Sequence, residues 1–266
     1  VLEAADRPGG QVRLTASLKR RREILGIIDW RIAECERLGV DIRTNLYAEV
    51  ADVTALSPDL VIVATGGLPN TSFLTEGEDL ATTSWDILSG AVKPAGEVIV
   101  YDDNGAHPGF TVAEYLAGEG ARLTFVTPER ALAPDVGSTS APAYLKAFSD
   151  GGVEVRLALR LTAIRRDGNR RVAMFRDEYG RRDVELRADQ VVVENGTLPN
   201  DDLYFALKPL STNLGAVDHA AWIAGRGQDG RRNPDGVFQL FRIGDAVAGR
   251  NIHAAVHDAL RLLKNA

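Results

Sequence analysis

Two stretches of the chain share one pattern of apolar positions and much of their sequence. The run DLVIVATGGLPN (59–70) and the run DQVVVENGTLPN (189–200) agree at seven of twelve positions, at an offset of 130 residues. Each is a short, Val-rich apolar run that ends in glycine and proline, which is typical of a buried strand followed by a tight turn. Seven identities in order favour an internal duplication over chance similarity between two strands.

A second pair of similar segments precedes these strands. Gly39–Arg43 and Gly152–Arg156 both begin with a glycine that can end a helix and continue as an extended segment. Helical stretches come before both, with apolar faces at Ile28, Ile32, Cys35 and Leu38 in the first copy and at Tyr144, Leu145 and Phe148 in the second. The pattern therefore predicts two copies of one α/β unit.

The second copy is predicted to be longer at its start. It opens with a strand over Glu97–Tyr101, a loop, a helix over Phe110–Ala117 and a strand over Leu123–Val126. The first copy has only Val1–Glu3, the equivalent of the last of these strands. By the repeat, the opening strand, glycine loop and helix of the first unit are missing, and we expect a fragment of a longer protein.

The fold class follows from this order of elements. Alternating strands and helices predict mostly parallel sheets with right-handed crossovers. A small antiparallel meander is predicted between Leu157 and Leu186, and a strand (237–245) and a helix (251–263) are expected to return to the first unit. We expect an α/β fold of two Rossmann-like (FAD/NAD(P)-binding) units, the second inserted in the first, with the first truncated at its N-terminus. The predicted boundaries are 1–92 and 195–266 for the first unit and 93–194 for the second.

Composition and charge then narrow the function classes. The chain has 31 Lys+Arg against 37 Asp+Glu, a formal net charge of −6, which argues against nucleic-acid or membrane-surface binding. The longest apolar runs are far shorter than the roughly 18 residues of a spanning helix. The single cysteine, Cys35, excludes an intrachain disulfide and a four-cysteine zinc or iron–sulfur site within this chain. No segment resembles a signal peptide, and a cytoplasmic location is expected.

The end of the first predicted strand carries the first candidate binding residues. Glu3 ends an apolar strand, where the acid of a Rossmann unit accepts hydrogen bonds from the adenosine ribose. A solvated loop carboxylate is the alternative, but the paired glycines that follow would let the backbone approach a ligand closely. We include the loop residues Arg7, Gly9, Gly10 and Gln11 in the candidate nucleotide site.

Two further strand ends are candidates for the same site. Thr65 and Gly66 follow a buried strand at the carboxyl edge of a parallel sheet, where ligands bind. Gly244 and Asp245 also end a strand and precede a helix. Asp245 can accept a hydrogen bond from a ribityl hydroxyl, and the helix N-terminus near Ile252 can face a pyrophosphate. The alternatives are an ordinary strand exit and a helix-capping aspartate.

The loop 102–109 (DDNGAHPG) lies where the second unit should carry its G-x-G-x-x-G motif. With Gly109 as the last glycine, the two earlier positions fall on Asn104 and Ala106. Two carboxylates, Asp102 and Asp103, lie where a diphosphate would bind and would repel it. We therefore expect weak or absent dinucleotide binding in the second unit, with Gly105 and Gly109 shaping a modified pocket.

Other residues with chemical potential favour structural roles. His253 and His257 are four apart on a predicted helix and lack a third metal ligand, so a partly buried, hydrogen-bonded pair is expected. The alternative for His253 is a place near a flavin ring, because it follows the Gly244–Asp245 element. Cys35 lies on an apolar stripe, which favours packing over reactivity. The basic run 19–22 (KRRR) is expected to be solvated or to face a domain. No metal site and no catalytic acid, base or nucleophile is predicted.

Several motifs together resemble a known family. VLE (1–3), GGQ (9–11), ATG (64–66) and IGD (243–245) resemble flavoproteins with two dinucleotide-binding domains. IDWR (28–31), YDDNGAHPG (101–109) and AEYLA (113–117) resemble the carboxyl-terminal region of old-yellow-enzyme-type NADH:flavin oxidoreductases. That group includes trimethylamine and histamine dehydrogenases, dienoyl-CoA reductase and N-methylproline demethylase-like proteins. The aspartate-rich loop most resembles the amine-demethylating branch.

The resemblance implies cofactors and partners. In that family an FMN-bearing barrel and an iron–sulfur cluster precede this region, so both would lie in a missing N-terminal part or a partner chain. The first unit would hold FAD or, as in some members, ADP alone. The second would hold NAD(P)H where its site is intact, and the altered loop argues against that here. The resemblance also allows for a homo-oligomer.

Two functions follow from the sequence. The first is the nucleotide-binding region of a flavin-dependent oxidoreductase, of amine dehydrogenase/demethylase or enoate reductase type, inactive when alone. The alternative is a non-catalytic module that binds ADP structurally or serves as a scaffold.

Overall fold

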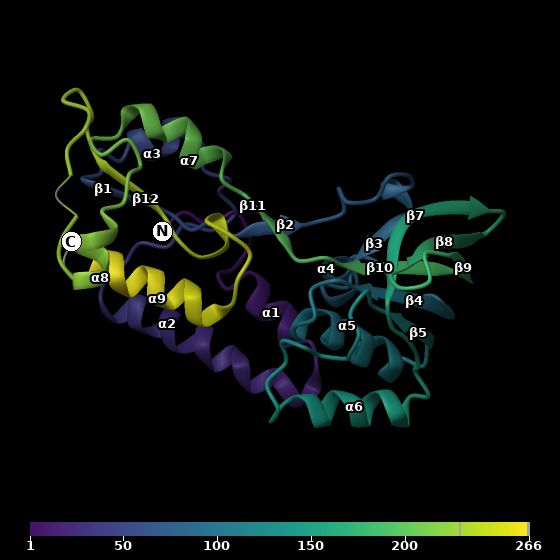
Figure 1. The fold of residues 1–266 in the computed structure, drawn as a ribbon. Coiled ribbons are helices and arrows are strands. Elements are labelled where there is room, and N and C mark those ends of the chain that lie inside the picture. The colour runs from purple at the N-terminus through teal and green to yellow at the C-terminus, as the bar shows by residue number, and fades with distance from the viewer. Residues whose placement is uncertain (229, 265–266) are drawn as a thin grey trace. The chain divides into compact units, whose positions relative to one another are not determined.

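The chain forms two compact units in a computed structural model that describes residues 1–228 and 230–264. Unit 1 consists of three stretches, Val1–Gly10, Ile27–Leu68 and Thr197–Ala266, and unit 2 consists of Gln11–Gly26 and Pro69–Gly196. Residues 11–26 and 69–92, which we predicted to lie in the first unit, thus group with the unit that holds residues 93–194. Figure 1 shows the elements of both units.

Unit 2 is built on a parallel sheet of five strands, which confirms the predicted α/β class. Its strands run in the order β3 (Ala81–Thr83), β10 (Gln190–Glu194), β4 (Glu97–Asp102), β5 (Arg122–Val126) and β6 (Glu154–Arg156), and every neighbouring pair is parallel. The helices of this unit are α1 (Gln11–Thr15), α4 (Ser84–Leu88), α5 (His107–Gly118) and α6 (Ala141–Asp150), with the 3-10 turns Lys19–Leu25 and Glu78–Leu80.

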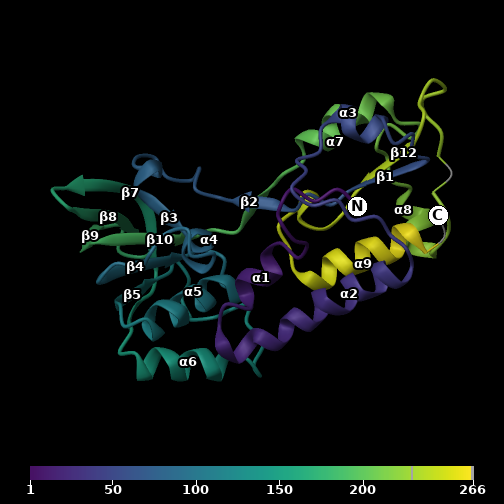
Figure 2. The same ribbon diagram turned by 180° about the vertical axis from the view of Figure 1, so that it is seen from behind.

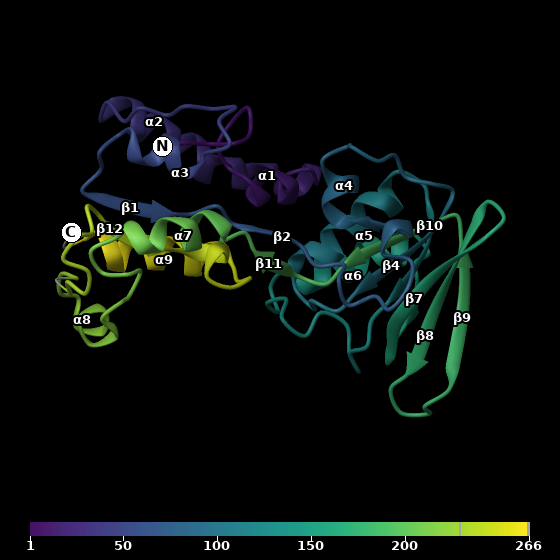
Figure 3. The same cartoon turned by 90° about the horizontal axis from the view of Figure 1, so that it is seen from above.

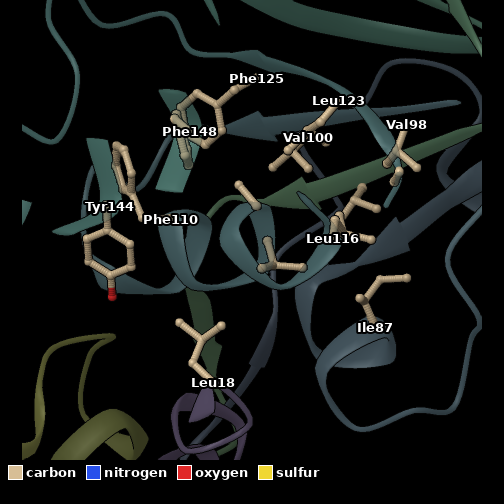
Figure 4. Packing of buried hydrophobic residues seen from close by; sticks show 14 of the residues in the cluster. Leu18, Ile87, Val98, Val100, Phe110, Leu116, Leu123, Phe125, Tyr144 and Phe148 are labelled. Atoms are coloured by element: carbon tan, nitrogen blue, oxygen red, sulfur yellow. The ribbon is translucent and has the colours of Figure 1, made fainter. Parts of the chain in front are cut away.

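Side chains alternate along a strand, so the central strand β4 presents apolar side chains to both faces of this sheet. Val98 and Val100 pack against α5 and α6 in one buried cluster, where the ring centroids of Phe110 and Phe125 are 5.0 Å apart (Figure 4). Ile99 and Tyr101 belong to a second cluster on the opposite face, which is shared with an antiparallel meander.

The predicted meander is confirmed as β7 (Leu159–Asp167), β8 (Arg170–Asp177) and β9 (Asp183–Ala188), which lie side by side in Figure 3. Its apolar side chains cover one face of the parallel sheet, and its charged side chains alternate with them. Unit 2 is therefore layered: helices, parallel sheet, meander.

Unit 1 holds a parallel pair, β1 (Leu60–Val63) and β12 (Gln239–Arg242), visible in Figure 2. In the part of the chain that the structure describes, β1 pairs with β12 alone, whereas its repeat counterpart β10 lies between two strands. The predicted strand Val1–Glu3 is reduced to one parallel bridge between Leu2 and Arg43. The helices of unit 1 are α2 (Gly26–Arg37, whose first residue groups with unit 2), α3 (Val50–Thr54), α7 (Asp202–Leu207), α8 (His219–Ala224) and α9 (Ile252–Leu263), with the 3-10 turns Lys208–Leu210 and Gly244–Ala246.

The repeated Leu-Pro segments lie in two short strands that pair with each other, β2 (Gly67–Pro69) and β11 (Thr197–Pro199). A Cβ on Gly67 would lie 2.8 Å from the carbonyl oxygen of Leu198, so this position accepts only glycine without rearrangement. Gly67 therefore allows the β2 and β11 segments to pack closely together.

Two predicted helix faces are only partly correct. Leu38 is 65% exposed because α2 ends one residue before it, and Ile28 is the buried member of that stripe. In α6, Tyr144 and Phe148 are buried, whereas Leu145 is 43% exposed.

Candidate functional site

The carboxyl ends of β1 and β12 bring two of the predicted binding segments to one edge. Because the two strands are parallel neighbours, the turn after β1, with Thr65 and Gly66, and the turn after β12, with Gly244 and Asp245, leave the pair at the same end. The backbone N–H of Ile243 donates to the carbonyl oxygen of Val63 at 3.0 Å and extends the pairing up to the two turns.

Two hydrogen bonds with the backbone of Asn200 hold the turn after β1. The Thr65 hydroxyl donates to the carbonyl oxygen of Asn200, and the Asn200 N–H donates to the carbonyl oxygen of Gly66 at 3.0 Å. Gly66 has φ of +74°, in the left-handed region that favours glycine, and no atom lies within 4 Å of the place that its Cβ would take. The backbone at Gly66 is therefore open to a ligand.

The second turn is held by two arginines. Arg242 donates to Asp201 and, at 3.2 Å, to the carbonyl oxygen of Ala246, and its guanidinium lies 4.7 Å from the Tyr204 ring centroid. The N–H of Arg250 donates to Oδ1 of Asp245 at 2.9 Å. The sequence motif around Gly244 and Asp245 did not reveal the role of Arg242, because its carboxylate partner, Asp201, lies 41 residues away in the chain.

Helix α9 begins directly after this turn. Asn251 caps it by accepting a hydrogen bond from the Ala254 N–H at 2.9 Å, and Ile252 is its half-buried first residue. His253 and His257 are both exposed, so the expected partly buried pair is wrong; His257 contacts Arg261 at 3.3 Å instead. The buried residues of α9 are Asp258 and Leu262, whereas Val256, Leu260 and Leu263 are exposed, so apolar character along this helix does not by itself mark its covered face.

Glu3 lies at the end of the strand-like segment that bridges to Arg43. Its backbone N–H donates to the Arg43 carbonyl oxygen at 2.9 Å, and its carboxylate Oε1 accepts the N–H of Ala5 at 2.9 Å. The half-buried carboxylate thus shapes the loop that follows it. Arg7 is exposed and lies 3.8 Å from Asp6.

The glycines of this loop adopt backbone conformations that favour glycine. Gly9 has φ of +126° and Gly10 of +45°, and Gly10 has open space at its Cβ position. Gln11 begins α1 and groups with unit 2, whereas the other candidates of this loop lie in unit 1.

The degenerate glycine loop of unit 2 is closed by the chain itself. A Cβ on Gly105 would lie 2.7 Å from Cγ of Pro134, and the Asp135 N–H donates to the Gly105 carbonyl oxygen at 3.1 Å. The segment is anchored by Val136, which is 7% exposed in the core that contains Phe110. The Gly105 side of this loop is therefore covered by residues 134–136.

The two carboxylates of this loop have different surroundings. Asp102 is 1% exposed beneath Gly109, where a Cβ would lie 2.4 Å from its Cγ, and burial and then the charge of Glu194 raise its pKa. Asp103 pairs with Arg160 at 2.8 Å and accepts from the Tyr101 hydroxyl at 3.2 Å. The charge of Asp103 is therefore partly offset by that of Arg160.

Glu194 ends the neighbouring strand β10 and is 5% exposed. It accepts hydrogen bonds from the Ser84 hydroxyl, from the Asn104 amide at 3.1 Å and from the Gly196 N–H at 3.1 Å. Burial raises its pKa, and these donors partly offset the effect. The carboxyl edge of the unit 2 sheet is thus filled by satisfied polar groups.

The basic run contacts the N-terminus of α5 within unit 2. Arg21 donates to the Tyr144 hydroxyl and contacts Nδ1 of His107 at 2.8 Å, while Arg20 pairs with Glu114 and lies 4.4 Å from the Tyr144 ring centroid. Burial, followed by Arg21 and Arg20, lowers the pKa of His107. The run is therefore partly packed against the unit rather than fully solvated.

Residues 1–228 and 230–264 carry no side-chain cluster suited to a metal ion and no helix suited to spanning a membrane. No group of three or more His, Cys, Asp or Glu side chains in that part of the chain is arranged to hold a metal ion. No helix there has the length and apolar character needed to cross a bilayer.

Comparisons with known proteins connect this geometry to a group of enzymes. The chain is 50% identical over 265 residues to "Probable N-methylproline demethylase" of Rhizobium meliloti, covering 100% of the chain and 39% of that protein. It is 40% identical to N,N-dimethylglycine/sarcosine dehydrogenase of Chromohalobacter salexigens, with 100% and 40% covered.

A third relative carries the name of the old yellow enzymes. It is the multifunctional alkene reductase/demethylase OYE of Caballeronia cordobensis, 39% identical, with 98% of the chain and 39% of that protein covered. The chain matches the carboxyl-terminal region of old-yellow-enzyme-type flavin oxidoreductases. It spans about two-fifths of the length of these relatives. No family model matches the chain.

Solved structures share the fold. Histamine dehydrogenase from Rhizobium sp. 4-9 matches with a TM-score of 0.80 at 21% identity, covering 100% of this chain and 40% of that one. A 2-naphthoyl-CoA reductase complex matches with a TM-score of 0.78 at 24% identity, covering 98% and 35%. At these identities the likeness supports the fold alone.

Proposed function

We propose that the chain is the nucleotide-binding region of a flavin-dependent oxidoreductase of the amine dehydrogenase/demethylase or enoate reductase type, with unit 1 holding FAD or ADP. The observation that carries the proposal is the meeting of the Thr65–Gly66 and Gly244–Asp245 turns at one edge of the β1–β12 pair. Ligands of parallel sheets bind at such carboxyl edges. The names of the similar proteins, which are demethylases, a dehydrogenase and an alkene reductase, support the proposed reaction class.

The residues of unit 1 fit an adenine nucleotide or a flavin. The open backbone at Gly66 would let a ligand approach, and the Asp245 carboxylate would accept a hydrogen bond from a ribityl hydroxyl. Glu3 would accept from the ribose of the adenosine through the oxygen that does not bind Ala5. The N-terminus of α9 would face the pyrophosphate. A bound flavin would supply electron transfer, while the residues of this chain would bind and orient it.

Pyridine nucleotide would not bind in unit 2. Pro134 and Asp135 cover Gly105, and the Asp102 carboxyl fills the space beneath Gly109. Chemical steps would then take place outside this chain, with none of its residues acting as acid, base or nucleophile. We also propose that the second unit is inserted in the first along the chain, with unit 1 serving the flavin-like site and unit 2 the closed one.

The test is thermal unfolding of the purified chain with FAD, ADP or NADH, together with its visible spectrum. A ligand that binds only the folded state raises stability by about 2.7 kcal/mol at one hundred times its Kd. We expect a higher Tm with FAD or ADP, and no change with NADH. Asp245→Asn should reduce the shift, while Asp235→Asn, at an exposed loop position, should leave it unchanged.

The outcomes distinguish a flavin site, a structural nucleotide site and a unit 1 that binds neither ligand. A yellow protein, or a shift with FAD above that with ADP, supports the flavin site. A shift with ADP alone favours a structural nucleotide, the role of a non-catalytic module. An unchanged Tm with both FAD and ADP contradicts the proposal.

A further inference from the structure

Asp258 is a buried carboxylate on α9 that no part of the proposed ligand site uses directly. It is 3% exposed, although an unpaired buried carboxylate is strongly unfavourable. Its partners are therefore informative. It ion-pairs with Arg250, and its Oδ2 accepts the backbone N–H of Gly244 at 3.0 Å.

Arg250 completes a clamp around a single residue. The guanidinium that pairs with Asp258 also donates to the carbonyl oxygen of Gly244 at 3.2 Å. The two side chains thus hold both backbone polar groups of Gly244. The backbone N–H of Arg250 meanwhile binds Oδ1 of Asp245, the next residue.

The turn packs closely on α9 at Gly244. Gly244 has φ of +60°, and a Cβ there would lie 3.1 Å from Cβ of Ala255. A small residue at position 255 and a glycine at position 244 let the turn approach the helix closely. The approach brings Gly244 within reach of Asp258, which lies one helical turn after Ala255.

A clamp of this kind contributes placement more than stability. Replacing a buried ion pair by apolar side chains of similar volume is often neutral or stabilising, so a buried pair is weak evidence for stability. A binding group must, however, be held within a fraction of an ångström by surrounding hydrogen bonds. Charge-assisted bonds such as those of Asp258 and Arg250 are well suited to that role.

We propose that Asp258 and Arg250 are positioning residues that fix the Gly244–Asp245 turn for nucleotide binding in unit 1. The inference rests on the proposed function. In this proposal α9 contributes more than its N-terminus to the site, because Asp258 of this helix accepts the hydrogen bond that fixes the Gly244–Asp245 turn.

The experiment compares Asp258→Leu, which keeps similar bulk but removes the acceptor, with Asp258→Asn, which keeps one acceptor for the Gly244 N–H. The control is Leu262→Ala, a core position of the same helix that is 6% exposed and outside the clamp. Two quantities are measured: amide hydrogen exchange at Gly244 relative to Leu240 of β12, and the Kd for ADP by calorimetry.

We expect Asp258→Leu to accelerate exchange at Gly244 selectively and to weaken ADP binding about tenfold, the effect of losing one hydrogen bond to a charged group. Asp258→Asn should restore part of both. Leu262→Ala should change exchange at Gly244 and Leu240 in proportion and leave the Kd unchanged.

The contrary results are separable. If Asp258→Leu behaves like Leu262→Ala in both measurements, the clamp is overturned while the nucleotide site stands. If the unsubstituted chain binds neither ADP nor FAD, the proposed function fails, and the positioning role fails with it whatever the exchange rates are.

Discussion

At the scale of single residues, the two aspartates of the 102–109 loop show how position changes the meaning of a carboxylate. Asp102 is enclosed beneath the α5 N-terminus, and Asp103, its neighbour, reaches Arg160 and the Tyr101 hydroxyl. Burial therefore disfavours the ionised form of Asp102, whereas the charge of Asp103 is paired with Arg160.

This contrast predicts opposite effects of two matched substitutions. Because burial raises the pKa of Asp102, the stability that its protonated form provides is lost as the pH rises through that raised pKa. Asp102→Asn, which resembles the protonated acid, should therefore raise the urea midpoint at pH 8, with a smaller gain at pH 5. Asp103→Asn should lower the free energy of unfolding at pH 8 by up to about 1 kcal/mol, because it weakens a partly exposed ion pair. An equal loss for Asp102→Asn at both pH values would show that the carboxylate is needed in its ionised form.

The sequence could indicate where binding residues lie but not what holds them. Thr65, Gly66, Gly244 and Asp245 follow apolar runs, so their place at strand ends could be predicted, and the structure brings them to one edge. Arg242 and Asp258 could not be recognised, because an ion pair depends on which distant residue the fold brings near. The exposure of His253 and His257 likewise depends on which face of α9 is covered.

At the scale of elements, most strands could be predicted because short apolar runs and the internal repeat mark them. The pairing of β12 with β1 and the meander β7–β8–β9 agree with the expectation. Helix ends were harder to place: α2 stops before Leu38, and α5 begins at His107, earlier than the predicted start at Phe110. Pro108 in the first turn of α5 is compatible with a helix, because the first N–H groups have no partner within the helix.

One contact between elements can be tested with a matched pair of glycines in unit 2. Gly77 and Gly90 have φ of +80° and +81°, but a Cβ on Gly77 would lie 1.8 Å from the Ile164 carbonyl oxygen, whereas none of the atoms near Gly90 comes within 4 Å. Gly90→Ala should cost about 1–2 kcal/mol for the left-handed backbone alone. Gly77→Ala should cost at least ~1–3 kcal/mol more, because the segment that bridges to β7 must move.

Urea denaturation of the two variants measures the difference directly. Equal losses for Gly77→Ala and Gly90→Ala would mean that the contact between Gly77 and β7 is looser than described.

At the scale of the whole molecule, the two units carry the same repeated strand and turn but differ at the edge where a ligand would bind. In unit 1 the turns after β1 and β12 present Gly66 with open space beside it. In unit 2 the equivalent edge holds Glu194 and Asp102, and Pro134 lies over Gly105. The repeated sequence was expected to reflect duplication of one unit, and the local contacts explain why we assign nucleotide binding to unit 1.

We propose that unit 1 binds an adenine nucleotide or flavin and that unit 2 binds none. Hydrogen exchange of the chain, measured alone and with saturating ADP, FAD or NADH, distinguishes the two units. We expect ADP or FAD to slow exchange at residues 64–66 and 243–252, while residues 103–109 exchange at the same rate with every ligand. Protection of residues 103–109 by NADH, or unchanged exchange at both unit 1 turns with ADP and FAD, would contradict the proposal.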